Sequence, residues 1–402
     1  MLQGPASFFF SALAQALRAG GAAVHKIHLC PGDRLFWRGG EAAAFRGRPA
    51  DWTEFLLPHA ASRQITDLVC LGDGRWWHAA AIAALEPLGV RIHIVEQGYL
   101  RPGWLTVEPG GTGGNSRFPK DWARIARLAT EDKAPAAPDF RAGFAAYAAM
   151  DVAYNLSNVV AGPLLYPHYR THALDSPWRE WAGWIGKALR RPWRKRALSR
   201  AEARLARHAG AFYLLPLQLE TDFQIRLHGP DEGMRGVLQK VVTSFAKYAP
   251  ADALLGVKVH PLDNGWTPWQ RLLAEFSQEA GIADRTIYFD GGDLLALLAR
   301  AKGVVTVNST VGLSAMRAGV PVMVLGKAIY DIPGLSHQGG LDAFWAANAP
   351  VDKARLNVLV AALAATIQVP GGFDGQGVRP GAEAMAERIL APRLPIDTAV
   401  PH

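Results

Sequence analysis

The sequence predicts an α/β fold made of two Rossmann-like halves joined by a helical insertion. Strand-like apolar runs alternate with helix-like stretches in the first part of the chain, the same alternation returns later, and no strand-like run lies between. At 402 residues the chain also exceeds the size at which a single core stops growing. We therefore expect a first domain over residues 1–118, a helical basic insertion over 119–210, a second domain over 211–375, and a final helix and tail over 376–402.

The first half opens with a helix over residues 8–18, which follows a Gly-Pro turn and ends at a Gly-Gly pair. Runs rich in Val, Ile and Leu then predict parallel strands, two of which end at Gly-containing turns. The predicted strands cover 24–29, 65–71 and 90–95, with a helix over 78–85 between the last two.

The second half repeats this alternation. Its strand-like runs are short and almost wholly apolar, as expected for buried parallel strands. The predicted strands cover 212–216, 254–259, 286–289, 304–307 and 320–325; the predicted helices include 294–301, 313–318 and 382–390.

Composition excludes several classes of protein. Half of the residues are hydrophobic and 19% are charged, which is typical of a globular chain and not of a disordered one. Both cysteines, Cys30 and Cys70, lie in or beside apolar runs and are expected to be buried thiols of a reducing compartment. No stretch is long and apolar enough to predict a transmembrane helix, and the start of the chain lacks the features of a signal peptide. A cytoplasmic protein is predicted.

Positive charge is concentrated in one segment. Residues 179–207 carry ten Lys or Arg against two acids, and Trp residues are interleaved with them or lie just before them. Basic helices with Trp are typical of surfaces that lie on anionic lipid. The alternative is a solvated helical insertion whose tryptophans pack inward. Nucleic acid is not expected as a partner, because no nucleic-acid-binding motif accompanies the charge.

Two short motifs predict a site for a nucleoside monophosphate-sugar. Each follows a predicted strand, and ligands of open α/β sheets bind beyond the carboxyl ends of the strands. A His and a Lys facing a Ser-Thr pair at the start of a helix can hold a phosphate through charge, hydroxyls and backbone N–H groups. The residues of this site are Lys258, His260, Pro261, Asn308, Ser309 and Thr310.

Each motif also has a purely structural interpretation. His260 could be a core histidine that ends a strand, although Lys258 and the Ser-Thr turn favour the binding role. The Ser309-Thr310 pair could be an ordinary helix N-cap, and the two roles are compatible.

Glu96 is the candidate acid/base of the first half, because it directly follows the predicted strand 90–95. A partly desolvated carboxyl there has a raised pKa and can exchange protons with a bound hydroxyl. The alternatives are a structural role for Glu96, with Arg101 as its ion-pair partner, and Glu108 as the functional carboxyl; Glu108 lies further from the strand end.

The sequence resembles the β-Kdo glycosyltransferases of Gram-negative capsule assembly, in particular the small single-module type that starts the poly-Kdo linker on lysophosphatidylglycerol. Kdo is 3-deoxy-D-manno-oct-2-ulosonic acid. The matching motifs extend over nearly the whole chain, and their joint occurrence in the right order is far more specific than any one of them. They are QGP at 3–5, PGD at 31–33, LGDGR at 71–75, EQGYLRP at 96–102, LTVE at 105–108, PLQLETDFQIR at 216–226, KVHPLD at 258–263 and NST at 308–310.

This resemblance implies a GT-B-like fold, with the two halves facing a central cleft, and a peripheral enzyme at the inner face of the cytoplasmic membrane. It implies CMP-Kdo as donor, bound by the His-Pro and Ser-Thr motifs, and a lysophospholipid acceptor; other capsule assembly proteins are expected as partners. It places a carboxylate nucleophile in the run 216–226, where Asp222 is the first candidate and Glu220 the second. Double displacement with retention needs such a nucleophile and a second group as acid/base, for which Glu96 is the candidate.

Further residues are candidates for binding Kdo or the acceptor. Arg75 or Arg101 could pair with the Kdo carboxylate, although either could be structural. The segment that opens the first helix offers backbone N–H groups to an acceptor phosphate or glycerol. The complete set is Gln3, Gly4, Ser7, Asp73, Arg75, Arg101 and Gln218.

No metal and no other cofactor is predicted, because no Asp-x-Asp pair stands at a strand end in the positions expected of a metal-dependent transferase. Two alternative functions stay open. One is a transferase for another CMP-nonulosonate such as sialic acid, and the other is a non-catalytic capsule-export component that binds lipid-linked glycan.

Overall fold

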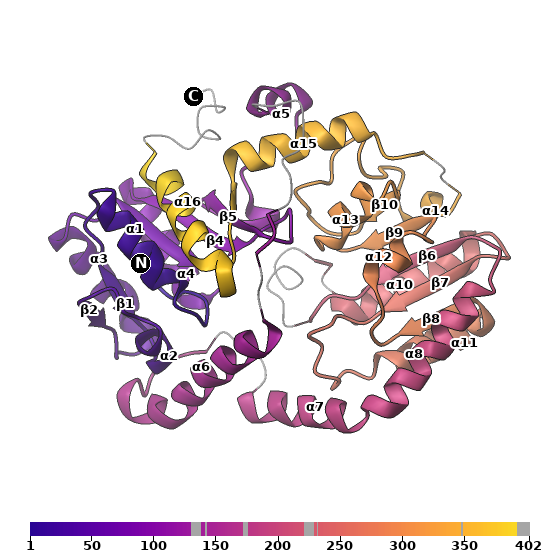
Figure 1. Ribbon diagram of the computed structural model, residues 1–402, viewed down its shortest axis with the longest axis horizontal. Coiled ribbons are helices and arrows are strands. Elements are labelled where there is room, and N and C mark those ends of the chain that lie inside the picture. Colours follow the sequence, from indigo (N-terminus) through magenta and orange to yellow (C-terminus); the bar gives the residue numbers. More distant parts are fainter. Residues whose placement is uncertain are drawn as a thin grey trace. The chain divides into compact units, whose positions relative to one another are not determined.

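The computed structural model describes residues 1–129, 138–140, 143–171, 176–220, 229–230, 232–346 and 349–391. The chain divides into two compact units (Figure 1). Unit 1 comprises Met1–His172 and Val358–His402, and unit 2 comprises Ala173–Asn357. The predicted α/β class with two separate α/β units is confirmed.

Unit 2 contains a five-stranded sheet in which every neighbouring pair is parallel, in the order β10-β9-β6-β7-β8. All five predicted strands are present. They are β6 (Phe212–Pro216), β7 (Leu254–Lys258), β8 (Thr286–Phe289), β9 (Gly303–Thr306) and β10 (Val322–Val324); the helices are α7 (Pro177–Leu189), α8 (Arg191–Ala206), α10 (Gly233–Tyr248), α11 (Trp269–Glu279), α12 (Leu294–Leu298), α13 (Val311–Arg317) and α14 (Leu341–Phe344).

The central strands of this sheet form because their residues are apolar on both faces. Every residue of β6, β7 and β9 is buried. Tyr213 on β6 packs edge-on against Phe245 and Trp345, and its hydroxyl donates to the carbonyl of Trp345 at 2.5 Å. This core fixes the sheet whose carboxyl edge carries the predicted nucleotide motifs.

Unit 1 contains a four-stranded sheet in the order β11-β5-β4-β3 and a separate parallel pair, β1 and β2. Residues 1–3 link the two, because Leu2 and Gln3 bond to β3 while the Met1 carbonyl accepts from Ile27 of β1. The strands are β1 (Lys26–His28), β2 (Ala42–Ala44), β3 (Asp67–Leu71), β4 (Arg91–Gln97), β5 (Trp104–Pro109) and β11 (Gln368–Pro370). The helices are α1 (Phe9–Ala19), α2 (Pro31–Leu35), α3 (Trp52–Ser62), α4 (Trp76–Leu85), α5 (Trp122–Leu128), α6 (Phe144–Leu165), α15 (Lys353–Thr366) and α16 (Val378–Leu390), of which α15 crosses the boundary with unit 2.

Two expectations about organisation are wrong. The sheet of the first half is not wholly parallel, because the unpredicted strand β5 runs antiparallel to β4. The second domain does not extend to residue 375, because β11 pairs with β5 and α16 packs on α1 in unit 1 (Figure 1). The predicted insertion 119–210 is helical where it is described, but α5 and α6 belong to unit 1 and α7 and α8 to unit 2.

Candidate functional site

The candidate site in unit 2 lies at the carboxyl edge of its parallel sheet. The chain adds β7 and β8 on one side of β6 and then returns to place β9 and β10 on the other side. The strand order therefore reverses between β6 and β9, and such a reversal point is where open α/β sheets bind ligands.

Gln218 and Asn308 meet at this point. Gln218 follows β6, Asn308 follows β9, and their side chains and backbone form two hydrogen bonds. Gln218 Nε2 donates to Asn308 Oδ1 at 2.8 Å, and the Asn308 backbone N–H donates to Gln218 Oε1 at 3.1 Å. Gln218 is buried. The structure thus joins two residues that the sequence placed in separate motifs with separate roles.

The Ser309-Thr310 turn opens α13 next to this pair. Ser309 Oγ accepts from the backbone N–H of Val311 at 3.2 Å, and the Ser309 carbonyl accepts from the hydroxyl of Tyr330. The N-cap residue of α13 is Thr310, whose side chain makes no capping hydrogen bond, so Ser309 makes a serine turn just before the helix and is not its N-cap. Its hydroxyl proton is not used in that bond and can be donated to a phosphate oxygen, so the binding role stays a prediction.

Gly312, in the first turn of α13, is needed for the position of this turn. A β-carbon there would lie 2.5 Å from Cζ of Tyr330, which is buried. We expect Gly312→Ala to destabilise unit 2 by about 1–3 kcal/mol, as overpacking usually does, in chemical denaturation. Gly162→Ala on α6 is the control, because a β-carbon there meets nothing within 4 Å; it should be neutral or stabilising. Equal stability of Gly312→Ala and the parent protein would contradict this role.

His260 follows β7 and is half-buried. Its Nδ1 accepts from the backbone N–H of Leu262 at 3.1 Å. A neutral ring that accepts at Nδ1 carries its proton on Nε2, which is the donor that a phosphate oxygen requires. Pro261 is exposed in the following turn.

Lys258 is buried at the end of β7, and its charged neighbours include Asp290, which follows β8, and Lys187 of α7. Burial lowers its pKa, the carboxylate of Asp290 opposes that effect, and Lys187 adds to it. Asp290 in turn accepts two hydrogen bonds from Arg194, and Lys187 Nζ donates to the carbonyl of Asp263 at 2.6 Å. The members of this ionic cluster are far apart along the chain, so no local sequence motif predicts it.

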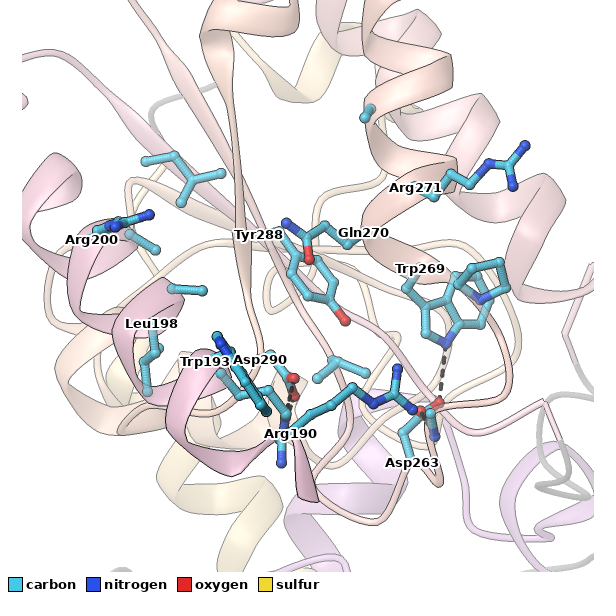
Figure 2. Close-up of a pocket in the computed structure, with 18 of the residues that line it drawn as sticks. Arg190, Trp193, Leu198, Arg200, Asp263, Trp269, Gln270, Arg271, Tyr288 and Asp290 are labelled. Atoms are coloured by element: carbon cyan, nitrogen blue, oxygen red, sulfur yellow. Dashed lines mark hydrogen bonds and ion pairs between the residues drawn. The ribbon is translucent and has the colours of Figure 1, made fainter. Parts of the chain in front are cut away.

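A groove with a volume of about 930 Å³ lies beside the loop that contains Asp263. It is bounded by α8, by the segment that leads into α11, and by β8. Figure 2 shows Trp193, Tyr288 and Trp269 around it, and Trp269 Nε1 donates to Asp263 Oδ2 at 3.1 Å. No pattern in the sequence predicts this groove, because the elements that bound it are separated along the chain.

Glu96 lies near the end of β4 in unit 1, over the turn that follows β3. A β-carbon at Gly72 would come within 2.8 Å of Glu96 Oε1, and Gly72 has φ +70°. Only glycine suits both conditions. The Glu96 carboxyl therefore lies against the turn that leads to Asp73, and its role as acid/base stays a prediction.

Asp73 and Glu108 hold the loop over residues 110–116. Asp73 Oδ2 accepts from the Thr112 backbone N–H at 3.3 Å and from Asn115 Nδ2 at 2.8 Å. Glu108 is fully buried and accepts from the hydroxyls of Tyr99, at 2.7 Å, and Ser116. Burial raises the pKa of Glu108 to about 8. These bonds give both carboxyls a structural role.

Of the two predicted arginines, Arg101 bonds to the local backbone, and Arg75 acts on a neighbouring histidine through its charge. Arg75 immediately precedes α4, and its charge adds to the burial that lowers the pKa of His78 to about 3. Arg101 Nε donates to the carbonyl of Gly98 at 2.9 Å. Pairing of either side chain with a sugar carboxylate stays a prediction.

The predicted acceptor segment makes packing contacts. Gln3 donates to the hydroxyls of Tyr154 and Tyr169 at 3.2 and 3.0 Å, and a β-carbon at Gly4 would lie 2.6 Å from the Phe10 ring. Ser7 Oγ accepts from the backbone N–H of Phe9 at the start of α1, at 3.3 Å. A role for these three residues in acceptor binding stays a prediction.

The candidate nucleophile Asp222 lies outside the described residues. Glu220 is described and is exposed, beyond Gln218.

Cys30 and Cys70 are buried free thiols, as predicted. Within the described ranges, no three His, Cys, Asp or Glu side chains are grouped as metal ligands would be.

A family model described as "Capsule polysaccharide biosynthesis protein" matches residues 66–373. The capsule polysaccharide export protein KpsS of Escherichia coli is 32% identical over 355 residues, covering 87% of this chain and 89% of KpsS. The capsule polysaccharide modification protein LipB of Neisseria meningitidis serogroup B is 32% identical over 385 residues, covering 94% of this chain and 91% of LipB. The solved structure titled Thermosulfurimonas dismutans KpsC, β-Kdo 2,7 transferase, covers 86% of this chain and 91% of its own at 15% identity and a TM-score of 0.42. The family match and the two curated relatives show that this chain belongs to the capsule polysaccharide biosynthesis proteins.

Proposed function

We propose that this protein is a retaining β-Kdo glycosyltransferase that uses CMP-Kdo and adds Kdo to a lysophospholipid in capsule linker synthesis. The supporting observation is the bonded pair of Gln218 and Asn308 at the point of unit 2 where the strand order reverses. His260 and the Ser309-Thr310 turn follow strands of the same sheet edge. The donor is inferred from the resemblance of these motifs to β-Kdo glycosyltransferases.

In the proposed reaction, His260 Nε2–H and the Ser309 and Thr310 hydroxyls bind the CMP phosphate. A carboxylate, Asp222 or in its place Glu220, attacks the anomeric carbon as the bond to the phosphate oxygen breaks and CMP leaves. The acceptor hydroxyl then displaces the carboxylate and gives its proton to Glu96. Two inversions give net retention. Lys258, His260 and the backbone meet the phosphate charge without a metal.

Calorimetric titration with CMP tests the donor site. We expect saturable binding that His260→Ala and Asn308→Ala each weaken by about 10-fold or more, because each loses a hydrogen bond to a charged or buried group. UMP and AMP are the ligand controls, and Lys240→Ala, an exposed residue of α10, is the protein control. Absence of CMP binding would overturn the proposal.

Mass spectrometry with CMP-Kdo and lysophosphatidylglycerol tests the reaction. A Kdo-lipid product is expected, and a transient Kdo adduct should map to the peptide that contains Asp222 and Glu220. Transfer from CMP-sialic acid in place of CMP-Kdo would indicate a different nonulosonate transferase. CMP binding without turnover of either donor would indicate a non-catalytic component.

A further inference from the structure

Helices α7 and α8 expose an unusual amount of large apolar surface. Trp178, Ile185 and Leu189 on α7 are 62%, 62% and 71% exposed, and Trp193 in the first turn of α8 is 65% exposed. Residues 178, 185 and 189 fall on one stripe of a helix with 3.6 residues per turn. The stripe therefore forms one continuous apolar face on α7, and Trp193 extends it into α8.

The opposite face of α7 is fixed against unit 2, so this stripe cannot turn inward. Gly183 and Lys187 are buried on that face. A β-carbon at Gly183 would lie 2.6 Å from the carbonyl oxygen of Asn264, and Lys187 Nζ donates to the carbonyl of Asp263 at 2.6 Å. α8 is held in the same way, because Ala201 and Leu205 are buried and Arg204 donates to the carbonyl of Thr286 at 2.8 Å.

Exposed cations flank the apolar face. Arg191, Lys195, Arg196 and Arg200 are all exposed, and in the part of the chain that the structure describes none of the four forms an ion pair with a carboxylate. Arg194, by contrast, is paired with Asp290. Each Lys or Arg near an anionic lipid surface contributes about 1 kcal/mol of attraction, and Trp favours the depth of the headgroups.

We propose that the α7–α8 face, defined by Trp178, Ile185, Leu189 and Trp193 with the flanking Arg191, Lys195, Arg196 and Arg200, docks on a bilayer that contains anionic phospholipid. A nucleic acid would use the cations but not the apolar stripe. α6 provides a contrast within the chain, since it exposes Val160 and Leu164 but contains no Lys or Arg. The inference rests on the proposed function for its purpose, because a lipid acceptor is presented at such a surface.

Sedimentation with vesicles tests this face in the full chain. The protein should sediment with vesicles of phosphatidylcholine and phosphatidylglycerol, much less with phosphatidylcholine alone, and less at high salt. The triple variant Arg191→Gln/Lys195→Gln/Arg196→Gln and the double variant Leu189→Ser/Trp193→Ser should each bind at least about 10-fold more weakly. Quenching of Trp fluorescence by brominated lipid should fall in the double variant.

Matched controls remove equal charge and equal apolar surface elsewhere. Lys240→Gln/Lys327→Gln/Lys353→Gln removes three exposed cations of unit 2, and Leu88→Ser/Leu295→Ser removes side chains that are 68% and 67% exposed. Both should bind vesicles as the parent protein does, and unchanged thermal unfolding will show that every variant is folded. Binding that is equal on neutral and anionic vesicles, or that survives both test variants, would overturn the inference.

The two proposals can fail separately. Vesicle binding needs no donor, and CMP binding needs no lipid. A protein that binds CMP but not anionic vesicles keeps the proposed function and loses the docking surface; the reverse result keeps the surface and loses the transferase.

Discussion

A Glu96→Gln substitution should lower the rate of Kdo transfer by about 100-fold to 10,000-fold, the usual contribution of a general acid or base, while CMP affinity stays unchanged. The amide keeps the shape of the side chain over Gly72 but cannot take the proton of the acceptor hydroxyl. CMP affinity should not move because the predicted nucleotide residues belong to unit 2. Product formation from CMP-Kdo, followed by mass spectrometry, gives the rate, and calorimetry gives the CMP affinity.

Glu54→Gln provides the matched control, because Glu54 is an exposed glutamate of α3 in the same unit. It should transfer Kdo at the parent rate. A Glu96→Gln variant that also transfers at the parent rate would exclude Glu96 as acid/base. Glu108 is a poor substitute for that role, since both of its oxygens accept hydrogen bonds from protein hydroxyls in a fully buried position.

The sheet of unit 2 could be predicted from the sequence because its strands are buried on both faces. Runs such as Leu254–Lys258 are apolar without alternation, and helices separate them. The predicted ends of two of these strands placed His260 and Asn308 at the carboxyl edge of the sheet. The bond between Gln218 and Asn308 could not be predicted, because it depends on β9 returning to lie beside β6, and no local pattern specifies that order.

Unit 1 was harder to predict because several of its pairings involve short or atypical segments. β11 has three residues, and one of them, Pro370, lacks a backbone N–H. β5 contains Thr106, Glu108 and Pro109 and so lacks a clear apolar pattern, although all of its residues are buried. A sequence pattern predicts that polar residues are exposed. A buried carboxyl such as Glu108 goes against this expectation, because its burial depends on hydrogen-bond partners that the sequence pattern does not reveal.

Glu108 links the strand β5 to the loop that follows it. Tyr99 donates to Glu108 and accepts from the Gly113 backbone N–H at 2.7 Å, while Ser116 bonds to the second carboxyl oxygen and accepts from the Phe118 backbone N–H at 3.2 Å. Burial raises the pKa of this carboxyl from 4.5 to about 8, the two hydroxyls partly offset that effect, and the charges of Asp73 and Glu96 add to it. The raised pKa favours the protonated form of Glu108 in the folded protein at neutral pH, and in that form one carboxyl oxygen donates to a neighbouring hydroxyl where the ionised form accepts from it.

Glu108→Gln should change how the stability of unit 1 depends on pH. Between pH 4.5 and about 8 the folded state of the parent protein binds a proton at Glu108 that the unfolded chain has lost. The contribution of Glu108 to the free energy of unfolding is therefore full below pH 4.5 and is lost as pH rises through about 8. Glutamine resembles the protonated acid and does not titrate. Denaturant unfolding, followed by a probe in unit 1, should find the variant about as stable as the parent at pH 4.5 and more stable at pH 9, by about 1–4 kcal/mol. A stability difference that stays the same at both pH values would show that Glu108 is ionised in the folded protein.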